Sequence, residues 1–318
     1  MAKLLCAADA PEWLELRRTG VTASDLPAIM GLVSWDSPWA LYHRKRGLLP
    51  EVEQTDRMRL GSWLEDRITG EWWNWHANGE MTMDPGGLYR SDERPWQMAT
   101  PDRTLEPSVA VLECKTSATR DGWGEDRSAD VPAYVRAQVL WQMDTLDVPT
   151  GHVAVVFLPS GEFRSYTIEH DTQTGESHEP GMDGRCLACR DQYAMRAAGL
   201  EFYKRITGDL GPPPVDHLTV TTKALQAVYA GLDDTLQAEL SPDLAEAWEG
   251  SRMLLRAAQR DKGLYDNLVR SELGTAGVGT LHGQPWVRRT ISKRAGYEVA
   301  PGVQDKLTTI KTREASDG

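Results

Sequence analysis

The chain has 318 residues, and its 35 Lys or Arg side chains against 47 Asp or Glu side chains give a formal net charge of −12. This acidity argues against a histone-like or generally basic nucleic-acid coat, because such proteins attract phosphate through net positive charge. A composition of 40% hydrophobic and 26% charged residues is typical of a globular protein. No apolar run is long enough to span a membrane, the N-terminus lacks the long apolar segment of a signal peptide, and four cysteines do not make a disulfide scaffold. We therefore expect a cytoplasmic protein without a membrane partner.

The first half of the chain is expected to hold the main core, because ten of the twelve tryptophans lie in the first 141 residues. Residues 11–171 are predicted to form one mixed α/β unit. Residues 173–190 are aperiodic and rich in polar residues, which favours an inserted loop, and residues 191–206 return to helical spacing.

A stiff linker is predicted at Gly211–Pro214, where three consecutive prolines follow a glycine. We therefore expect one domain over residues 1–210 and an extension over residues 215–318, whose function the sequence does not give. Residues 221–272 are predicted to form a helical hairpin whose second helix is capped by Ser241, and residues 285–291 a strand of a small β extension.

The most informative stretch is residues 99–117, in which Asp102 follows a proline and a strand then leads into Glu113, Cys114 and Lys115. Alternate side chains of a strand share one face, so Glu113 and Lys115 are expected on the same side. A turn would fold Asp102 back beside Glu113. Two carboxylates and one ammonium would then share a small site that suits Mg²⁺ and metal-assisted hydrolysis of a phosphodiester. Taken alone, so short a pattern favours an ion pair on an exposed strand.

Three flanking segments give this pattern its context. Residues 13–31 hold a Trp-Leu pair, an arginine and then Gly-Val-Thr-Ala-Ser; residues 61–65 read G-x-x-x-E; residues 132–143 hold a Tyr-x₃-Gln helix. Together with Pro101-Asp102 and Glu113-Cys114-Lys115, these segments resemble, in the same order, the motifs of the YqaJ-like, phage lambda-type exonucleases of the PD-(D/E)XK nuclease superfamily. The resemblance covers about residues 11 to 170. It implies a restriction-endonuclease-like α/β (α+β) core, a central mixed β-sheet flanked by helices.

The resemblance also implies roles for residues at the reacting centre. Asp102, Glu113 and the backbone carbonyl of Cys114 would hold Mg²⁺, or Mn²⁺ in its place, and Lys115 would activate the attacking water. Glu65 would add a carboxylate, directly or through a metal-bound water, although without the motif it reads as a surface residue. Gln138 would hydrogen-bond near the lysine or the scissile phosphate.

Other matched residues would bind the DNA end. Arg17, Ser24 and Thr100 correspond to the arginine and small hydroxyls that hold a 5′-phosphate in lambda-type exonucleases. The spacing to Ser24 favours Arg17 over Arg18. Ser24 also fits a helix N-cap, and both roles can coexist. Tyr134 lies one helical turn before Gln138 and is expected to contact substrate or to pack beside it.

Two further patterns carry weaker predictions. The C-x-x-C at Cys186 and Cys189 is expected to be a thiol pair in a loop, with a zinc site that uses His170 and His178 as the alternative. The basic run 43–46 is expected to be a solvated helix end. Residues 281–318 hold seven basic and four acidic residues and are a candidate arm for contacting DNA or a partner.

The function these motifs imply is a metal-dependent DNA exonuclease of a phage-type recombination system. It would digest linear double-stranded DNA from the 5′ end and leave 3′ single strands. A single-strand annealing protein is the implied partner, and the implied assembly is a homo-oligomer such as a ring of three subunits. An endonuclease or repair nuclease on the same core, or a non-catalytic module that binds DNA ends, remains the alternative. The net charge then excludes a broad basic clamp rather than DNA itself, because bound metal ions would offset the carboxylates that face phosphate.

Overall fold

The computed structural model describes residues 2–77, 81–106, 109–169, 187–231 and 235–291. Internal contacts divide the chain into two compact units, Met1–Ala230 and Gly231–Gly318. Helix α7 (Thr219–Val228) packs on α3 (Pro38–Lys45) and is therefore grouped with the first unit. The domain boundaries expected at residues 210 and 215 stay a prediction.

The first unit is built on a five-stranded sheet with strand order β3-β6-β7-β8-β9. The strands are β3 (Thr82–Pro85), β6 (Arg103–Glu106), β7 (Ala110–Ser117), β8 (Thr150–Phe157) and β9 (Glu162–Glu169). Strands β7 and β8 are parallel, whereas the other neighbours are antiparallel. Parallel neighbours need a crossover connection, and helix α5 (Ala133–Leu146) lies within it.

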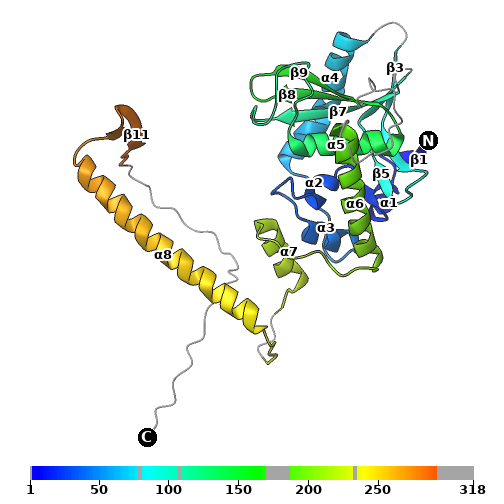
Figure 1. The fold of residues 1–318 in the computed structure, drawn as a ribbon. Coiled ribbons are helices and arrows are strands. Elements are labelled where there is room, and N and C mark those ends of the chain that lie inside the picture. Colours follow the sequence, from blue (N-terminus) through cyan, green and yellow to red (C-terminus); the bar gives the residue numbers. More distant parts are fainter. Residues whose placement is uncertain (1, 78–80, 107–108, 170–186, 232–234, 292–318) are drawn as a thin grey trace. The chain divides into compact units, whose positions relative to one another are not determined.

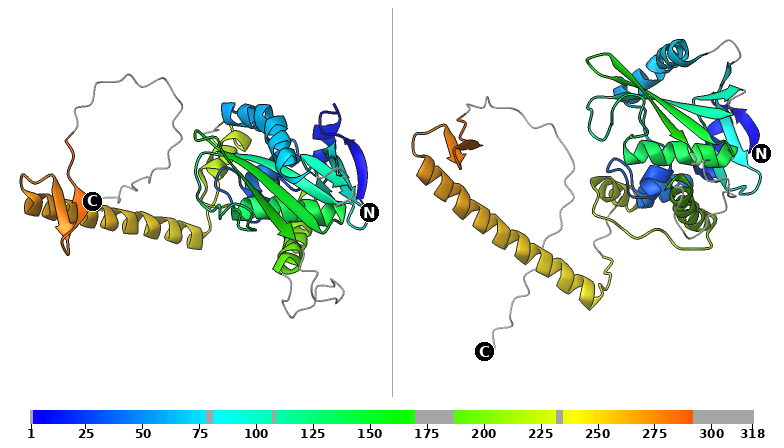
Figure 2. Two further views of the ribbon diagram at one scale, coloured as in Figure 1. Left: turned by 90° about the horizontal axis from the view of Figure 1, so that it is seen from above. Right: turned by 45° about the horizontal axis from the view of Figure 1, so that its top comes forward.

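Two helices cover opposite faces of this sheet, as the alternation of side chains along β7 requires (Figures 1 and 2). Val111 belongs to the buried cluster that includes α5. Leu112, the next residue, packs instead with Ile68 and Trp72 of α4 (Asp56–His76). The face that Glu113 shares with Val111 is therefore the α5 face.

A four-stranded sheet lies beside the first, with strand order β1-β4-β5-β2. Its strands are β1 (Ala2–Ala7), β4 (Gly87–Ser91), β5 (Gln97–Ala99) and β2 (Val21–Thr22). Helix α1 (Trp13–Arg18) precedes β2, and helix α2 (Leu26–Ile29) follows it. Strands β2 and β5 run parallel with Thr22 opposite Met98, so the chain leaves both strands at the same edge of the sheet.

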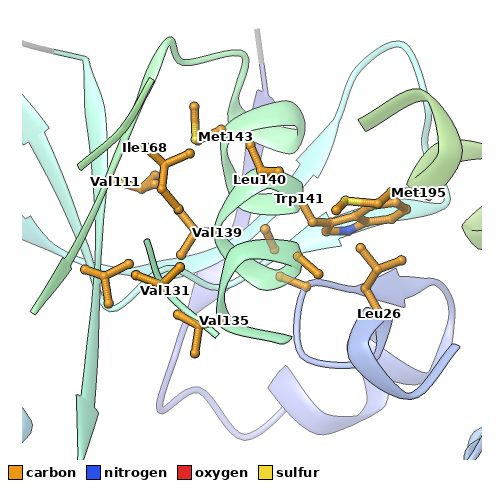
Figure 3. Close-up of a cluster of buried hydrophobic side chains, with 14 of the residues drawn as sticks. Leu26, Val111, Val131, Val135, Val139, Leu140, Trp141, Met143, Ile168 and Met195 are labelled. Atoms are coloured by element: carbon orange, nitrogen blue, oxygen red, sulfur yellow. The ribbon is translucent and has the colours of Figure 1, made fainter. Parts of the chain in front are cut away.

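The main core lies where α5 meets α2, β5 and α6 (Leu187–Thr207), as Figure 3 shows for Trp141, Leu26 and Met195. Trp141 is fully buried and donates its indole N–H to the Met98 carbonyl at 3.0 Å. A Cβ at Gly199 of α6 would come within 2.4 Å of the Trp141 ring. Close packing at this point therefore requires glycine.

The second unit contains α8 (Pro242–Leu273) and an antiparallel hairpin of β10 (Val278–Leu281) and β11 (Gln284–Arg288). The Ser241 hydroxyl caps α8 by accepting the Leu244 N–H at 3.3 Å, and Pro242 occupies the first turn. Among the described helices, none combines the length and the apolar composition that crossing a membrane requires.

The predicted mixed α/β class, a mixed sheet flanked by helices, is confirmed, as are the helix cap at Ser241 and the C-terminal β-hairpin. Residues 221–272 form two helices as expected, but these belong to different units. Helix α6 begins at Leu187, inside the segment expected to be a loop. His170, His178 and Cys186 lie outside the described residues, as does the part of the candidate arm (residues 281–318) that follows residue 291.

Candidate active site

The hairpin of β6 and β7 brings Asp102 to the strand that carries Glu113. The antiparallel register pairs Arg103 with Leu112. Continued by one residue, the same register places Asp102 opposite Glu113. The Asp102 carboxylate accepts the backbone N–H of Cys114 at 2.6 Å. The predicted fold-back of Asp102 beside the strand is therefore present.

The turn that holds Asp102 is supported by Gly86, which follows β3. Its N–H donates to the Asp102 carbonyl at 2.9 Å, and a Cβ at this position would come within 1.6 Å of the Pro101 carbonyl oxygen. Only glycine allows this approach of two backbone segments.

Glu113 and Lys115 point to the same side of β7, and α5 supplies the amides that meet them. The Lys115 ammonium donates to Glu113 Oε1 at 2.5 Å and to Gln138 Oε1 at 3.0 Å. Gln138 in turn donates through Nε2 to Glu113 Oε1 at 2.6 Å. The structure thus brings together three of the predicted residues in one hydrogen-bonded group.

Gln142 is a member of this group that the sequence reasoning missed. Its Nε2 donates to Glu113 Oε2 at 2.6 Å, while its own Oε1 is buried without a hydrogen-bond partner. Gln142 follows Gln138 by four residues, so both lie on one face of α5. This i, i+4 spacing from Gln138 was the sequence feature that could have predicted Gln142 as a member of the group.

Charges in the group influence one another strongly. Burial raises the pKa of the Asp102 carboxyl well above its usual range, and the Glu113 carboxylate raises it further, against the opposing effect of Lys115. Burial alone would lower the pKa of the Lys115 ammonium, but Glu113 and Asp102 outweigh it and raise that pKa. One ammonium does not neutralise two neighbouring carboxylates, so the binding of a further cation beside them is electrostatically favourable.

Glu65 of α4 lies at the edge of the group, held by an arginine. Arg103 donates through Nη1 to Glu65 Oε1 at 2.8 Å and through Nη2 to Asp66 at 2.6 Å. The Glu65 charge also contributes to the raised pKa of Asp102. Arg103 is a second residue that the sequence reasoning missed, although it directly follows Asp102.

A second cluster lies at the end of β2, where Arg17 of α1 reaches the residues before α2. Its Nη2 donates to Thr22 Oγ1 at 3.3 Å and also to Ser24 Oγ. Arg18 instead pairs with Glu51 at 2.8 Å, so Arg17 is the arginine that contacts Ser24. Helix α2 has no side-chain cap, so the interpretation of Ser24 as its N-cap is wrong.

A buried ion pair supports this cluster. Lys45 of α3 contacts Asp25 at 2.6 Å and donates to the carbonyls of Arg17 and Gly20. Burial would raise the pKa of Asp25, but Lys45 and Arg17 outweigh it and lower that pKa. The expectation of a solvated helix end over residues 43–46 is wrong, because the Lys45 side chain is only 6% exposed. Arg17, Ser24 and Lys45 line a cleft of about 180 Å³.

Thr100 lies next to both clusters, whereas Tyr134 lies near Lys115. Thr100 directly follows β5, at the sheet edge where Ser24 follows β2, and its hydroxyl is buried without a hydrogen-bond partner. Pro101 then leads to Asp102. Tyr134 of α5 contributes to the raised pKa of Lys115 and contacts the Trp35 ring edge-on at a centroid distance of 5.2 Å.

Comparison with known families finds a match that spans this region. Residues 12–152 match the model of the YqaJ-like viral recombinase domain. Over these residues the chain is similar to the YqaJ-like viral recombinase domain. The resemblance predicted from the sequence motifs is thereby confirmed.

Proteins similar to this chain include the YqaJ protein of Bacillus subtilis, which is 34% identical over 108 residues. The match covers 34% of this chain and 33% of that protein, so the chain aligns with only about a third of that relative.

Solved structures similar to this one include an alkaline exonuclease (LHK-Exo) from Laribacter hongkongensis, with 17% identity and a TM-score of 0.46 over 62% of this chain and 95% of that chain. A phage-related exonuclease from Haemophilus somnus has 11% identity and a TM-score of 0.39 over 60% of this chain and 96% of that chain.

The donor set around Asp102 and Glu113 fits a hard divalent cation. Asp102 and Glu113 are two neighbouring carboxylates, and Mg²⁺ typically takes one or two carboxylates and completes its shell with waters and phosphate oxygens. Asp102 Oδ1 has no hydrogen-bond partner within the part of the chain that the structure describes. In that same part, however, no group of three acidic, histidine or cysteine side chains is arranged to hold a metal ion. Glu65, which is paired with Arg103, is therefore not brought together with the other two carboxylates as a ligand group.

Proposed function

We propose that this protein is a metal-dependent DNA nuclease, and more specifically an exonuclease that digests linear double-stranded DNA from the 5′ end. The observation that carries the proposal is the group formed by Asp102, Glu113, Lys115 and Gln138, which lies within the segment similar to the YqaJ-like viral recombinase domain. Carboxylates beside an ammonium suit hydrolysis of a phosphodiester. The relatives described as exonucleases are consistent with this chemistry.

In this proposal each side chain has a separate task. Asp102 and Glu113, with the Cys114 carbonyl, would hold Mg²⁺ or Mn²⁺, which when bound would polarise the phosphodiester and acidify a water. Lys115 would orient the attacking water and stabilise negative charge at the phosphorus. Gln138 and Gln142 fix the Glu113 carboxylate by donating to both of its oxygens.

The cluster of Arg17 and Ser24 is proposed to hold the 5′-phosphate of the DNA end, with Thr100 beside it. A guanidinium with neighbouring hydroxyls suits a phosphate, because it offers several donors at fixed angles. The buried Thr100 hydroxyl, which has no partner, would gain one from such a ligand. Production of 3′ single strands, a single-strand annealing partner, a homo-oligomer and a cytoplasmic location in a bacterial host belong to the same proposal.

The decisive experiment compares linear and covalently closed circular duplex DNA, with 5′ and 3′ ends labelled separately. We expect rapid release of the 5′ label from linear DNA, no nicking of the circle, and loss of activity in EDTA that added Mg²⁺ restores. Rapid nicking of the circle would contradict the exonuclease proposal and favour an endonuclease. Binding of DNA ends without any cleavage in Mg²⁺ or Mn²⁺ would favour a non-catalytic module.

A further inference from the structure

A row of arginines lies along α8, outside the segment that matches the recombinase family. Arg252, Arg256 and Arg260 follow one another at intervals of four residues. With 3.6 residues per turn, these positions share one face of the helix and span about 12 Å along its axis. One strand of duplex DNA places about three to four phosphates in that length.

The arginines of this row have no carboxylate partner in the described part of the chain. Arg252 lies over the Trp248 ring, with 4.6 Å from its guanidinium carbon to the ring centroid. Glu249 is one turn before Arg252 but forms no ion pair with it. On other helices the same four-residue spacing joins opposite charges, as Arg205 and Glu201 show at 2.6 Å.

The row places like charges side by side, which disfavours an isolated helix. Arg252 and Arg256 are an i, i+4 pair, and so are Arg256 and Arg260; like charges at this spacing repel. Arg256 and Arg260 are exposed. Residues 250–291 hold seven basic and three acidic side chains in a chain whose net charge is −12. A polyanion that contacts the row would remove this repulsion.

We propose that the row of Arg252, Arg256 and Arg260 binds the phosphate backbone of DNA and so supplies the second unit with a nucleic-acid contact. The choice of DNA as the polyanion rests on the proposed nuclease function. Because guanidinium groups contact phosphates without reading bases, this binding would be independent of sequence. It would also be sensitive to salt, since each neutralised phosphate releases counterions.

The test uses the full chain in EDTA, so that binding is measured without cleavage. Fluorescence anisotropy with a labelled duplex and a labelled single strand gives the dissociation constant between about 50 and 200 mM salt. The variant Arg252→Gln/Arg256→Gln/Arg260→Gln should lower the slope of log K against log salt by about 2 to 3 and raise Kd roughly tenfold at low salt. The triple Arg→Lys variant should keep the wild-type slope.

A matched control removes the same charge from the same unit. Lys262→Gln/Arg270→Gln/Arg288→Gln changes residues outside the row, of which Lys262 is already paired with Asp266 at 2.8 Å. Its binding and slope should stay close to those of the wild type. If both triple Gln variants weaken binding equally, net charge rather than the row is responsible and the proposal is overturned.

Comparison of the duplex with the single strand, together with the nuclease assay, distinguishes the remaining outcomes. A loss with both DNA forms supports the row as a general backbone contact, and a loss with one form supports it and identifies that form. An unchanged slope and Kd with both overturns the proposal. Failure of the wild-type protein to cleave DNA would refute the nuclease function, yet would leave these binding measurements valid.

Discussion

Gln142 donates through Nε2 to Glu113 Oε2 at 2.6 Å, from the opposite side to the Lys115 ammonium on Oε1. Glu113 is only 3% exposed, so its carboxylate depends on these donors rather than on bulk water. A buried carboxylate oxygen that loses its donor changes orientation or takes up a proton. Gln142 is therefore a positioning residue for Glu113.

We expect Gln142→Met to lower kcat by about 10- to 100-fold, the usual effect of removing a residue that orients a metal ligand. KM for DNA should change little, because Gln142 is buried away from the surface. Steady-state digestion of linear duplex measures both constants. Arg136→Ala on the same helix is the control, since Arg136 pairs with Asp191. Equal activity of Gln142→Met and the wild type would show that the hydrogen bond from Gln142 is not required to orient the Glu113 carboxylate.

Lys115→Ala should abolish cleavage while DNA binding stays within a few-fold of the wild type. The ammonium contacts Glu113 and Gln138 directly, so its removal eliminates the group proposed to orient the attacking water. Cleavage of labelled linear duplex and binding in EDTA are the measurements. Lys223→Ala, at an exposed position of α7, should cleave normally. Cleavage by Lys115→Ala at the wild-type rate would place the chemistry elsewhere.

Arg17 and Arg18 form a matched pair for testing the end-binding cluster. Arg17 contacts Thr22 and Ser24, whereas Arg18 pairs with Glu51. We expect Arg17→Ala to remove the preference for a 5′-phosphate over a 5′-hydroxyl end, because it removes the guanidinium next to these hydroxyls. Arg18→Ala should keep the preference. The measurement is the ratio of initial rates on the two ends, and a ratio lost equally in both variants would contradict the assignment.

Local pattern was sufficient to predict the strand and the proximity of its charged side chains, whereas their assignment to a nuclease site depended on the flanking motifs. The alternation along β7 places Glu113 and Lys115 together, and the turn at Pro101 returns Asp102 to Cys114. These relationships depend on the geometry of a strand over a few residues, and such short-range geometry can be predicted from the sequence pattern.

Relationships between distant segments could not be predicted in the same way. The basic run of α3 reads as a solvated helix end, yet Lys45 is buried because the carbonyls of Arg17 and Gly20 and the carboxylate of Asp25 surround its ammonium. Arg103 reads as an ordinary strand residue, and only the packing of α4 on the sheet gives it Glu65 as a partner. Such partners are set by tertiary packing, which local periodicity does not encode.

Two helical glycines should respond to alanine with opposite signs. A Cβ at Gly199 would meet Trp141 at 2.4 Å and Trp96 at 3.0 Å, so Gly199→Ala should lower the free energy of unfolding by about 1 to 3 kcal/mol. A Cβ at Gly70 of α4 would meet nothing within 4 Å, so Gly70→Ala should raise it by up to about 1 kcal/mol through helix propensity. Urea unfolding measures both. Equal effects of the two substitutions would contradict the tight packing of α6 on Trp141.

The last prediction concerns His152 of β8, which lies between the Trp72 ring and Thr167. The ring centroids of His152 and Trp72 are 5.1 Å apart, and His152 Nδ1 is 3.1 Å from Thr167 Oγ1. Burial, with a smaller effect of His76, lowers the pKa of His152 to about 4. The unfolded chain, with an ordinary histidine pKa of about 6.5, therefore binds more protons than the folded chain between these values.

This difference makes stability rise with pH. The contribution of His152 is complete above pH of about 6.5 and is lost as the pH falls toward 4, by at most about 3.5 kcal/mol at about 1.4 kcal/mol per pKa unit. In His152→Gln the free energy of unfolding should fall less steeply over this range than in the wild type, because glutamine does not titrate. Urea unfolding at several pH values gives both curves. Parallel curves would mean that His152 accepts a proton in the folded state as readily as in the unfolded chain, and hence that its contact with Trp72 does not exclude the charged form.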